Sequence, residues 1–97
     1  MLETLTPASF TQHLNSQFRI DLGEQGKLEV VLYAVELHEA HPGPRPQPFS
    51  AHFRGPHRAV LPQQIYRLEH DQMGVLEIFL VTIGPDSDGM RYEAVFN

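Results

Sequence analysis

Apolar residues recur at every second position along most of the chain after Phe18, and this alternation constrains the fold more than any other feature. Side chains of a β-strand point to opposite faces in turn, so such alternation predicts strands that turn one face to a core. Six segments show the pattern: 18–21, 27–38, 49–54, 65–70, 75–83 and 90–96. The sequence therefore predicts a mainly β protein with about six strands.

Two architectures would bury the apolar faces of six short strands. A small antiparallel barrel or a compact two-layer sandwich hides both the faces and the strand edges, and the pattern alone leaves both open. The length of 97 residues provides one hydrophobic core, so we expect a single β-rich domain over residues 1–97.

The segments 65–70 and 75–83 flank Asp71-Gln72-Met73-Gly74, which is typical of a hairpin loop. We expect Leu68 to face Leu76 or Ile78, because either register keeps apolar side chains together. Arg67 then falls on the opposite face, close to an acidic residue of the second strand.

One short helix is predicted near the N-terminus, from Pro7 to about Leu14. Thr6 can cap it, Pro7 suits the first helical position, and Phe10 and Leu14 share a face. A helix of this length is stable only when docked, so we expect Phe10 and Leu14 to pack on the sheet. The surface that they would cover is the apolar outer end of the strand 75–83, with Phe79, Val81 and Ile83. A partner chain is the alternative cover.

The composition excludes several classes of protein. Twelve acidic and seven basic residues give a net charge of -5, unlike the basic footprint of nucleic-acid binders or of polybasic membrane-surface proteins. The absence of cysteine excludes disulfides, thiol catalysis and cysteine-rich zinc sites. No apolar run approaches the length of a membrane span, and the N-terminus lacks the pattern of a signal peptide. We therefore expect a soluble, cytoplasmic protein with neither nucleic acid nor membrane as partner.

The residues that could support catalysis have simpler explanations. Ser50 and His52 share a strand face, but any outward-facing polar strand offers such a pair, and no serine occupies a Gly-x-Ser-x-Gly elbow. Glu29 and Glu77 are acids set into apolar strand faces, as a catalytic pair would be. A basic neighbour that pairs with each carboxylate explains their presence without catalysis. We expect no catalytic residues.

Metal ligands also lack a recognised spacing. The pairs His38/His41 and His52/His57 match no zinc pattern. The loop Asp86-Ser87-Asp88-Gly89 lacks the further ligands of a calcium loop. We expect neither a metal site nor a cofactor.

Residues 40–48 hold four prolines in nine positions, and arginines cluster around them. Prolines stiffen a free loop and so reduce the entropy lost on binding, while arginine offers a planar head with several donors. We predict a binding surface on this loop and on the outward face of the next strand, with Arg45, His52, Arg54 and Arg58 as its contact residues. A solvated loop that carries charge for solubility is the alternative.

Several longer motifs resemble a known family. They are Gln47-Pro48-Phe49-Ser50, Phe53-Arg54-Gly55-Pro56, Tyr66-Arg67-Leu68-Glu69-His70, Ile83-Gly84-Pro85-Asp86 and the C-terminal Gly89-Met90-Arg91-Tyr92-Glu93-Ala94-Val95-Phe96-Asn97. Over nearly its whole length the chain resembles the small bacterial proteins of the 6916 family of domains of unknown function. The resemblance implies a stand-alone bacterial domain in the company of phage-tail-like or tail-collar proteins, and it implies no activity.

These observations favour a non-catalytic binding or assembly module with a protein partner, and the resemblance implies a role accessory to phage-tail-like proteins. A small-ligand-binding β-barrel is the alternative, and a small enzyme with an unrecognised site is a second one. A pocket with converging polar groups would favour the ligand-binding barrel.

Overall fold

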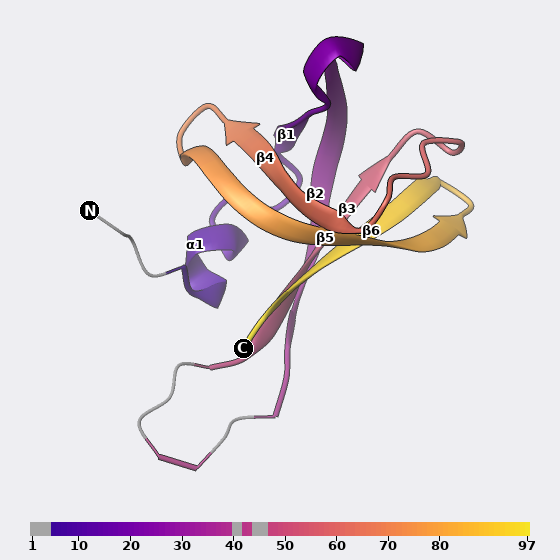
Figure 1. Cartoon of the computed structure of the whole chain (residues 1–97). Helices are drawn as coiled ribbons and strands as arrows, with labels where there is room; N and C mark the ends of the chain where they lie inside the picture. Colours follow the sequence, from indigo (N-terminus) through magenta and orange to yellow (C-terminus); the bar gives the residue numbers. More distant parts are fainter. Residues whose placement is uncertain (1–4, 40–41, 44–46) are drawn as a thin grey trace.

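The computed structural model describes residues 5–39, 42–43 and 47–97, and in this part of the chain six strands form one closed antiparallel barrel (Figure 1). The elements are α1 (Pro7–Thr11), β1 (Gln17–Asp21), the 3-10 turn η1 (Gly23–Gln25), β2 (Lys27–Leu37), β3 (Phe49–Gly55), β4 (Gln64–His70), β5 (Gly74–Asp86) and β6 (Gly89–Phe96). The mainly β class and the short N-terminal helix are confirmed, and of the two architectures the barrel is the one formed.

The strands follow the order β1-β2-β3-β6-β5-β4 around the wall, and β4 returns to β1. The closing seam is short, with Arg19 opposite Glu69 and Ile20 opposite Leu68. In the β4–β5 hairpin Leu68 faces Leu76, one of the two expected registers, and Arg67 lies opposite Glu77 on the outer face. Closure gives every strand a neighbour on both sides, which protects the edges from pairing with other chains.

Large side chains fill the interior of the barrel. The bulkiest of those with less than 2% of their surface exposed are Tyr92, Phe10, Phe18, Phe49 and Phe53. A barrel of this size has room for side chains but not for a sizeable ligand, so the interior is a packed core.

Helix α1 begins as expected but ends earlier and docks elsewhere. Thr6 and Ser9 form a reciprocal capping box, and the helix ends at Thr11, which leaves Leu14 40% exposed. Phe10 is fully buried, with its ring 5.8 Å from that of Phe49 and 5.4 Å from that of Phe96. No helix of the described residues is long and apolar enough to cross a membrane.

The expected position of α1 over Phe79, Val81 and Ile83 is therefore wrong. Phe49 and Phe96 both point into the barrel, so Phe10, which packs against them, fills the end of the barrel from inside. A side chain inside the wall cannot cover the outer face of β5. Phe79 remains 50% exposed and Ile83 37% exposed.

A β-bulge in β2 changes which side chains face outward. The register shifts between Leu32 and Ala34, after which Val35 lies opposite the buried Ala51 and Glu36 opposite Ser50. Unbroken alternation from Leu32 would have turned Ala34 and Glu36 inward, and the bulge turns both outward. Bulges commonly re-aim side chains in this way.

The strand β5 is also longer than predicted. It continues through Gly84 and Pro85 to Asp86, and a second register shift lies between Thr82 and Gly84. The turn to β6 is thereby reduced to Ser87 and Asp88. An extra residue in a bulge lets a strand bend while pairing continues beyond it, which sequence alternation does not reveal.

Candidate functional site

Arg54 lies on the outward face of β3, where it is held by contacts within the molecule. Its Nε lies 3.2 Å from Oδ1 of Asp86, and its Nη2 contacts the second carboxylate oxygen. The guanidinium carbon also lies 4.0 Å from the ring centroid of Tyr33. These hydrogen bonds, aided by the backbone N–H groups of Asp88 and Gly89, lower the pKa of Asp86 to about 2. Arg54 thus ties β3 to the β5–β6 turn.

His52 lies two positions earlier on the same face, between two carboxylates. Its Nε2 is 3.0 Å from Oε1 of Glu36 and 4.0 Å from Oε2 of Glu93. Only 13% of the side chain is exposed, so His52 also makes its main contacts within the fold.

The other two predicted contact residues lie apart from this pair. Arg58 is exposed in the loop after β3, where its carbonyl accepts a hydrogen bond from the backbone N–H of Val60 at 3.0 Å and its side chain pairs with none of the described residues. Arg45 lies outside the described residues. The structure therefore brings His52 and Arg54 onto one face, while a shared binding role for the four stays a prediction.

The structure gives Ser50 and His52 different partners, although they share a strand face. The Ser50 hydroxyl lies 2.7 Å from Nε2 of His38, and Ser50 is completely buried. The two acids considered for catalysis are also separated, because Glu29 is on β2 and Glu77 is on β5, which are not neighbours in the wall.

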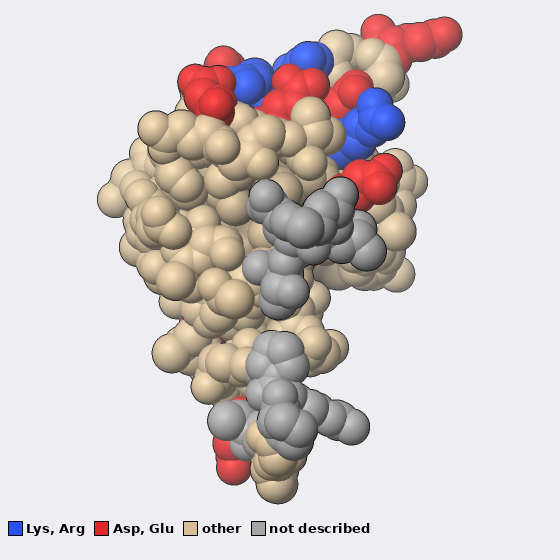
Figure 2. Space-filling view, turned by 90° about the vertical axis from the view of Figure 1, so that its left-hand side faces the viewer, with Lys and Arg blue, Asp and Glu red and all other residues tan. Residues whose placement is uncertain are grey.

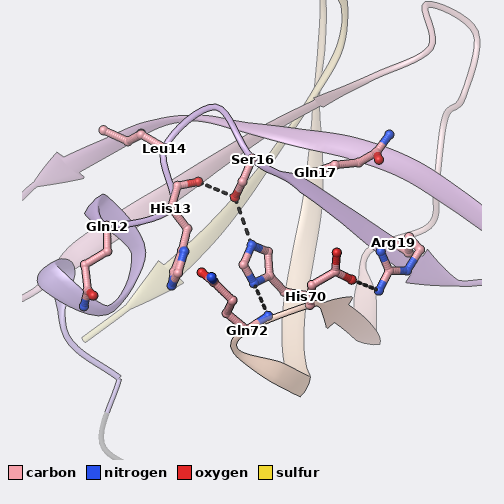
Figure 3. Close-up of a pocket in the computed structure, with 9 residues that line it drawn as sticks. Gln12, His13, Leu14, Ser16, Gln17, Arg19, His70 and Gln72 are labelled. Carbon is pink, nitrogen blue, oxygen red and sulfur yellow. Dashed lines mark hydrogen bonds and ion pairs between the residues drawn. The ribbon is translucent and has the colours of Figure 1, made fainter.

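An open hollow of about 390 Å³ lies beside α1 (Figure 3). It is lined by Gln12, His13, Leu14, Ser16, Gln17, Arg19, His70, Asp71 and Gln72. The hydroxyl of Ser16 lies 3.0 Å from Nε2 of His70. This pair resembles a serine nucleophile and its histidine base. Whether His70 can take the proton of Ser16 depends on which ring nitrogen of His70 carries a proton.

The hydrogen bonds of His70 argue against that chemistry. Its Nδ1 accepts from the backbone N–H groups of Gln72 and Met73, each at 3.1 Å. A neutral imidazole that accepts at Nδ1 carries its proton on Nε2 and donates it to Ser16. The Ser16 hydroxyl in turn donates to the carbonyl of His13 at 2.5 Å. His70 in this form cannot take a proton from Ser16, so the pair orders the loops around it.

Burial disfavours the charged form of His70. The residue is 7% exposed, and its ring lies 4.4 Å from that of Phe18 and 4.5 Å from that of His13. Burial lowers the pKa of His70, and the nearby His13 lowers it further. Sequence reasoning did not single out His70, although its alternation with Tyr66 and Leu68 placed it on the inward face.

Charged side chains gather at the end of the barrel that carries η1 (Figure 2). There Arg19 contacts Glu69 at 3.5 Å and Asp71 at 3.1 Å, and Nζ of Lys27 lies 2.8 Å from Glu69. The hydrogen bond from Lys27 is the main reason why the pKa of Glu69 is lowered. These ion pairs reinforce the β1–β4 seam.

Three exposed apolar side chains lie on the outer faces of three consecutive strands of the wall. Ile65 on β4 lies opposite Phe79 on β5. Val95 lies on β6, two residues beyond Glu93, which pairs with Val81 of β5. Ile65 is 65% exposed, Phe79 50% and Val95 51%. We call Ile65, Phe79 and Val95 the apolar row.

Potential metal ligands meet next to this row. One ligand atom from each of Glu36, His38 and Glu93 lies within 4.8 Å of the other two. Neither histidine pair considered from the sequence forms this cluster, since His41 lies outside the described residues and His57 bonds to the carbonyl of Ser87. A bulge and three strands were needed to assemble it.

The comparisons agree with the motifs in the sequence. No curated protein and no solved structure matches the chain. One family model, described as a domain of unknown function (DUF6916), matches residues 5–96. The match spans the barrel together with its helix, and the chain belongs to this family.

Proposed function

We propose that this domain is a non-catalytic binding module that docks a protein partner on the apolar row. The observation that carries the proposal is the exposure of Ile65, Phe79 and Val95 on three consecutive strands of the wall, with Ile65 directly opposite Phe79. Single exposed apolar residues are ordinary, but several large ones on neighbouring strands of one domain are a common mark of an interface.

Two features support a binding role over the alternatives. The packed interior argues against a ligand inside the barrel. The proton on Nε2 of His70 argues against a serine nucleophile in the hollow beside α1. The sequence predicted that either the helix α1 or a partner chain covers the outer face of β5. Because α1 lies elsewhere, a partner chain is favoured as the cover.

Charge indicates the chemistry of the partner. Glu77, Glu93 and Arg67 border the apolar row, Arg67 lies opposite Glu77, and the chain carries a net charge of -5, so acidic charge is in excess. A matching surface has an apolar centre with lysine or arginine at its rim, because complementary charge speeds encounter and excludes wrong partners. A second copy of this acidic chain matches less well. As the family resemblance implies, we take the partner to be a component of a phage-tail-like assembly.

The test compares Phe79→Ser with Val75→Ser. Val75 is 60% exposed on the same strand but lies opposite Glu69, away from the apolar row. Purified tail-like proteins from the source cells are titrated with each variant. We expect Phe79→Ser to weaken binding by at least about tenfold, which is typical of an interface aromatic, and Val75→Ser to leave it unchanged.

Sedimentation of the protein alone separates a partner from self-association. A wild-type dimer that Phe79→Ser converts to monomer would assign the row to a second copy. Binding of a tail-like protein that Phe79→Ser leaves unchanged, with both variants folded, would refute the proposed surface.

A further inference from the structure

We propose that Glu36, His38 and Glu93 bind a first-row divalent transition-metal ion of the Zn²⁺ type, with His52 as a positioning residue. The inference does not depend on the apolar row, and it runs against the expectation from spacing that the chain has no metal site.

The fold brings the three ligands together from distant parts of the chain. Glu36 lies near the end of β2, His38 directly follows that strand, and Glu93 comes from β6 on the far side of β3. The bulge after Leu32 turns Glu36 outward, and the backbone N–H of His38 donates to the carbonyl of Pro48 at 3.0 Å. Glu93 reaches the outer face directly opposite His52.

The spacing of the ligand atoms suits one ion. Zinc–nitrogen and zinc–oxygen bonds of about 2.1 Å in tetrahedral geometry place ligand atoms about 3.4 Å apart. The ligand atoms of Glu36, His38 and Glu93 lie within 4.8 Å of one another. Side-chain rotations that move these atoms by about an ångström would bring them to the tetrahedral spacing. Glu36 is 58% exposed, and Glu93 is 25% exposed, which leaves the carboxylates reachable from solvent.

The donor set selects the class of ion. Two carboxylates balance the charge of a divalent cation, and an imidazole is a ligand that zinc and its neighbours accept readily. Magnesium and calcium prefer sites made entirely of oxygen. Three protein ligands also leave a coordination position for water, as in open zinc sites.

Two further side chains orient the ligands. His52 places Nε2 at 3.0 Å from Glu36 and at 4.0 Å from Glu93, so it can donate a hydrogen bond to the first carboxylate while facing the second. Ser50 is completely buried and holds Nε2 of His38 at 2.7 Å. Hydrogen bonds of this kind fix ligands in metal sites, and their loss typically weakens metal binding by about 10–100-fold.

The test is calorimetric titration of the full chain with Zn²⁺, using two ligand variants and two matched controls. His38→Gln and Glu93→Gln remove ligands, while His57→Gln and Glu77→Gln change an exposed histidine and an exposed outer-wall acid that lie outside the cluster. We expect one ion per wild-type chain, a loss of at least about tenfold for each ligand variant, and unchanged affinity in both controls.

Side-chain NMR gives a readout that needs no variant. Zn²⁺ should shift the imidazole signals of His38 at one equivalent and leave those of His13 and His70 in place. Equal zinc affinity in wild-type and ligand variants, or shifts confined to His13 and His70, would overturn the proposal. The same His38 shifts with millimolar Mg²⁺ would overturn the assignment to a transition metal.

Discussion

At the residue scale, two polar side chains, Arg54 and His70, owe their properties to partners that lie far away along the sequence. Arg54 is paired with Asp86, 32 residues later, and His70 contacts Ser16, 54 residues earlier. Alternation along a strand indicates which face a side chain takes, but its partner on that face depends on which strands become neighbours.

Acid should destabilise the protein through His70. Its pKa is lowered in the folded state, so the unfolded chain takes up the proton first, at about pH 6.5. The stability is complete above that pH and is lost as the pH falls toward the lowered pKa of the folded state. Urea unfolding at about pH 7.5 and pH 5.5 should show this loss, and His70→Gln should reduce it while His57→Gln should not. Equal losses in both variants would exclude His70 as the cause.

The carboxyl group of Asp86 should titrate at about pH 2 in the folded protein. Arg54→Gln removes the hydrogen bonds that chiefly lower this pKa, so the titration should move up toward 3.8. The contribution of Asp86 to stability is present above about pH 4 and is lost as the pH falls to about 2. Carbon NMR of the side-chain carboxyl measures both titrations, and an unmoved midpoint in Arg54→Gln would contradict the pairing.

At the scale of elements, α1 and the β5–β6 turn depend on close packing more than on local propensity. A five-residue helix has little stability of its own, and Phe10 fixes it at the end of the barrel. The turn depends on the absence of a side chain at Gly89, where a Cβ atom would lie 2.1 Å from the carbonyl oxygen of Gly55.

Phe10→Ala should lower the free energy of unfolding by about 3–5 kcal/mol, the range for truncating a fully buried phenylalanine. Leu14→Ala should cost less than about 1 kcal/mol, because Leu14 is 40% exposed. Denaturant unfolding of the two variants measures the difference. Similar losses of unfolding free energy in the two variants would show that Phe10 does not fill the end of the barrel.

Gly89→Ala should destabilise the β5–β6 turn by about 1–3 kcal/mol, since the new methyl group meets backbone rather than a flexible side chain. Gly74→Ala is the matched control, because it also has a positive φ but has no atom within 4 Å of the added Cβ. The melting temperature of Gly89→Ala should be the lower of the two, and the reverse order would contradict the close approach to Gly55.

At the scale of the whole molecule, the barrel is closed by its shortest ladder. β1 and β4 are joined at two paired positions, whereas β3 and β6 pair over seven, from Phe49 to Gly55. The β1–β4 seam should therefore open first when the barrel fluctuates.

Amide hydrogen exchange should reveal this order of opening. We expect the β1–β4 amides to exchange faster than those between β3 and β6, because local opening breaks fewer contacts at the seam. Arg19→Gln should raise exchange at the seam further, since it removes the contacts with Glu69 and Asp71. Uniform exchange around the barrel would contradict this expectation.

The sequence by itself determined the strands and the family, and it narrowed the hairpin register at Leu68 to two choices, because alternation, turn residues and motifs are local signals. It did not reveal the bulge after Leu32 or the end of α1 at Thr11. The bulge depends on the pairing of β2 with β3, and the helix end on the docking of Phe10 against Phe49 and Phe96. A single extra residue in a strand leaves the overall apolar pattern almost intact.

Only the tertiary structure decided which faces and side chains meet. It placed Phe10 inside the barrel, left the apolar row exposed, paired Arg54 with Asp86, and gathered Glu36, His38 and Glu93 from two strands separated by a third. The physical reason is closure. Once six strands form one wall, each side chain acquires neighbours from other strands, and their identity follows from strand order and register rather than from spacing along the chain.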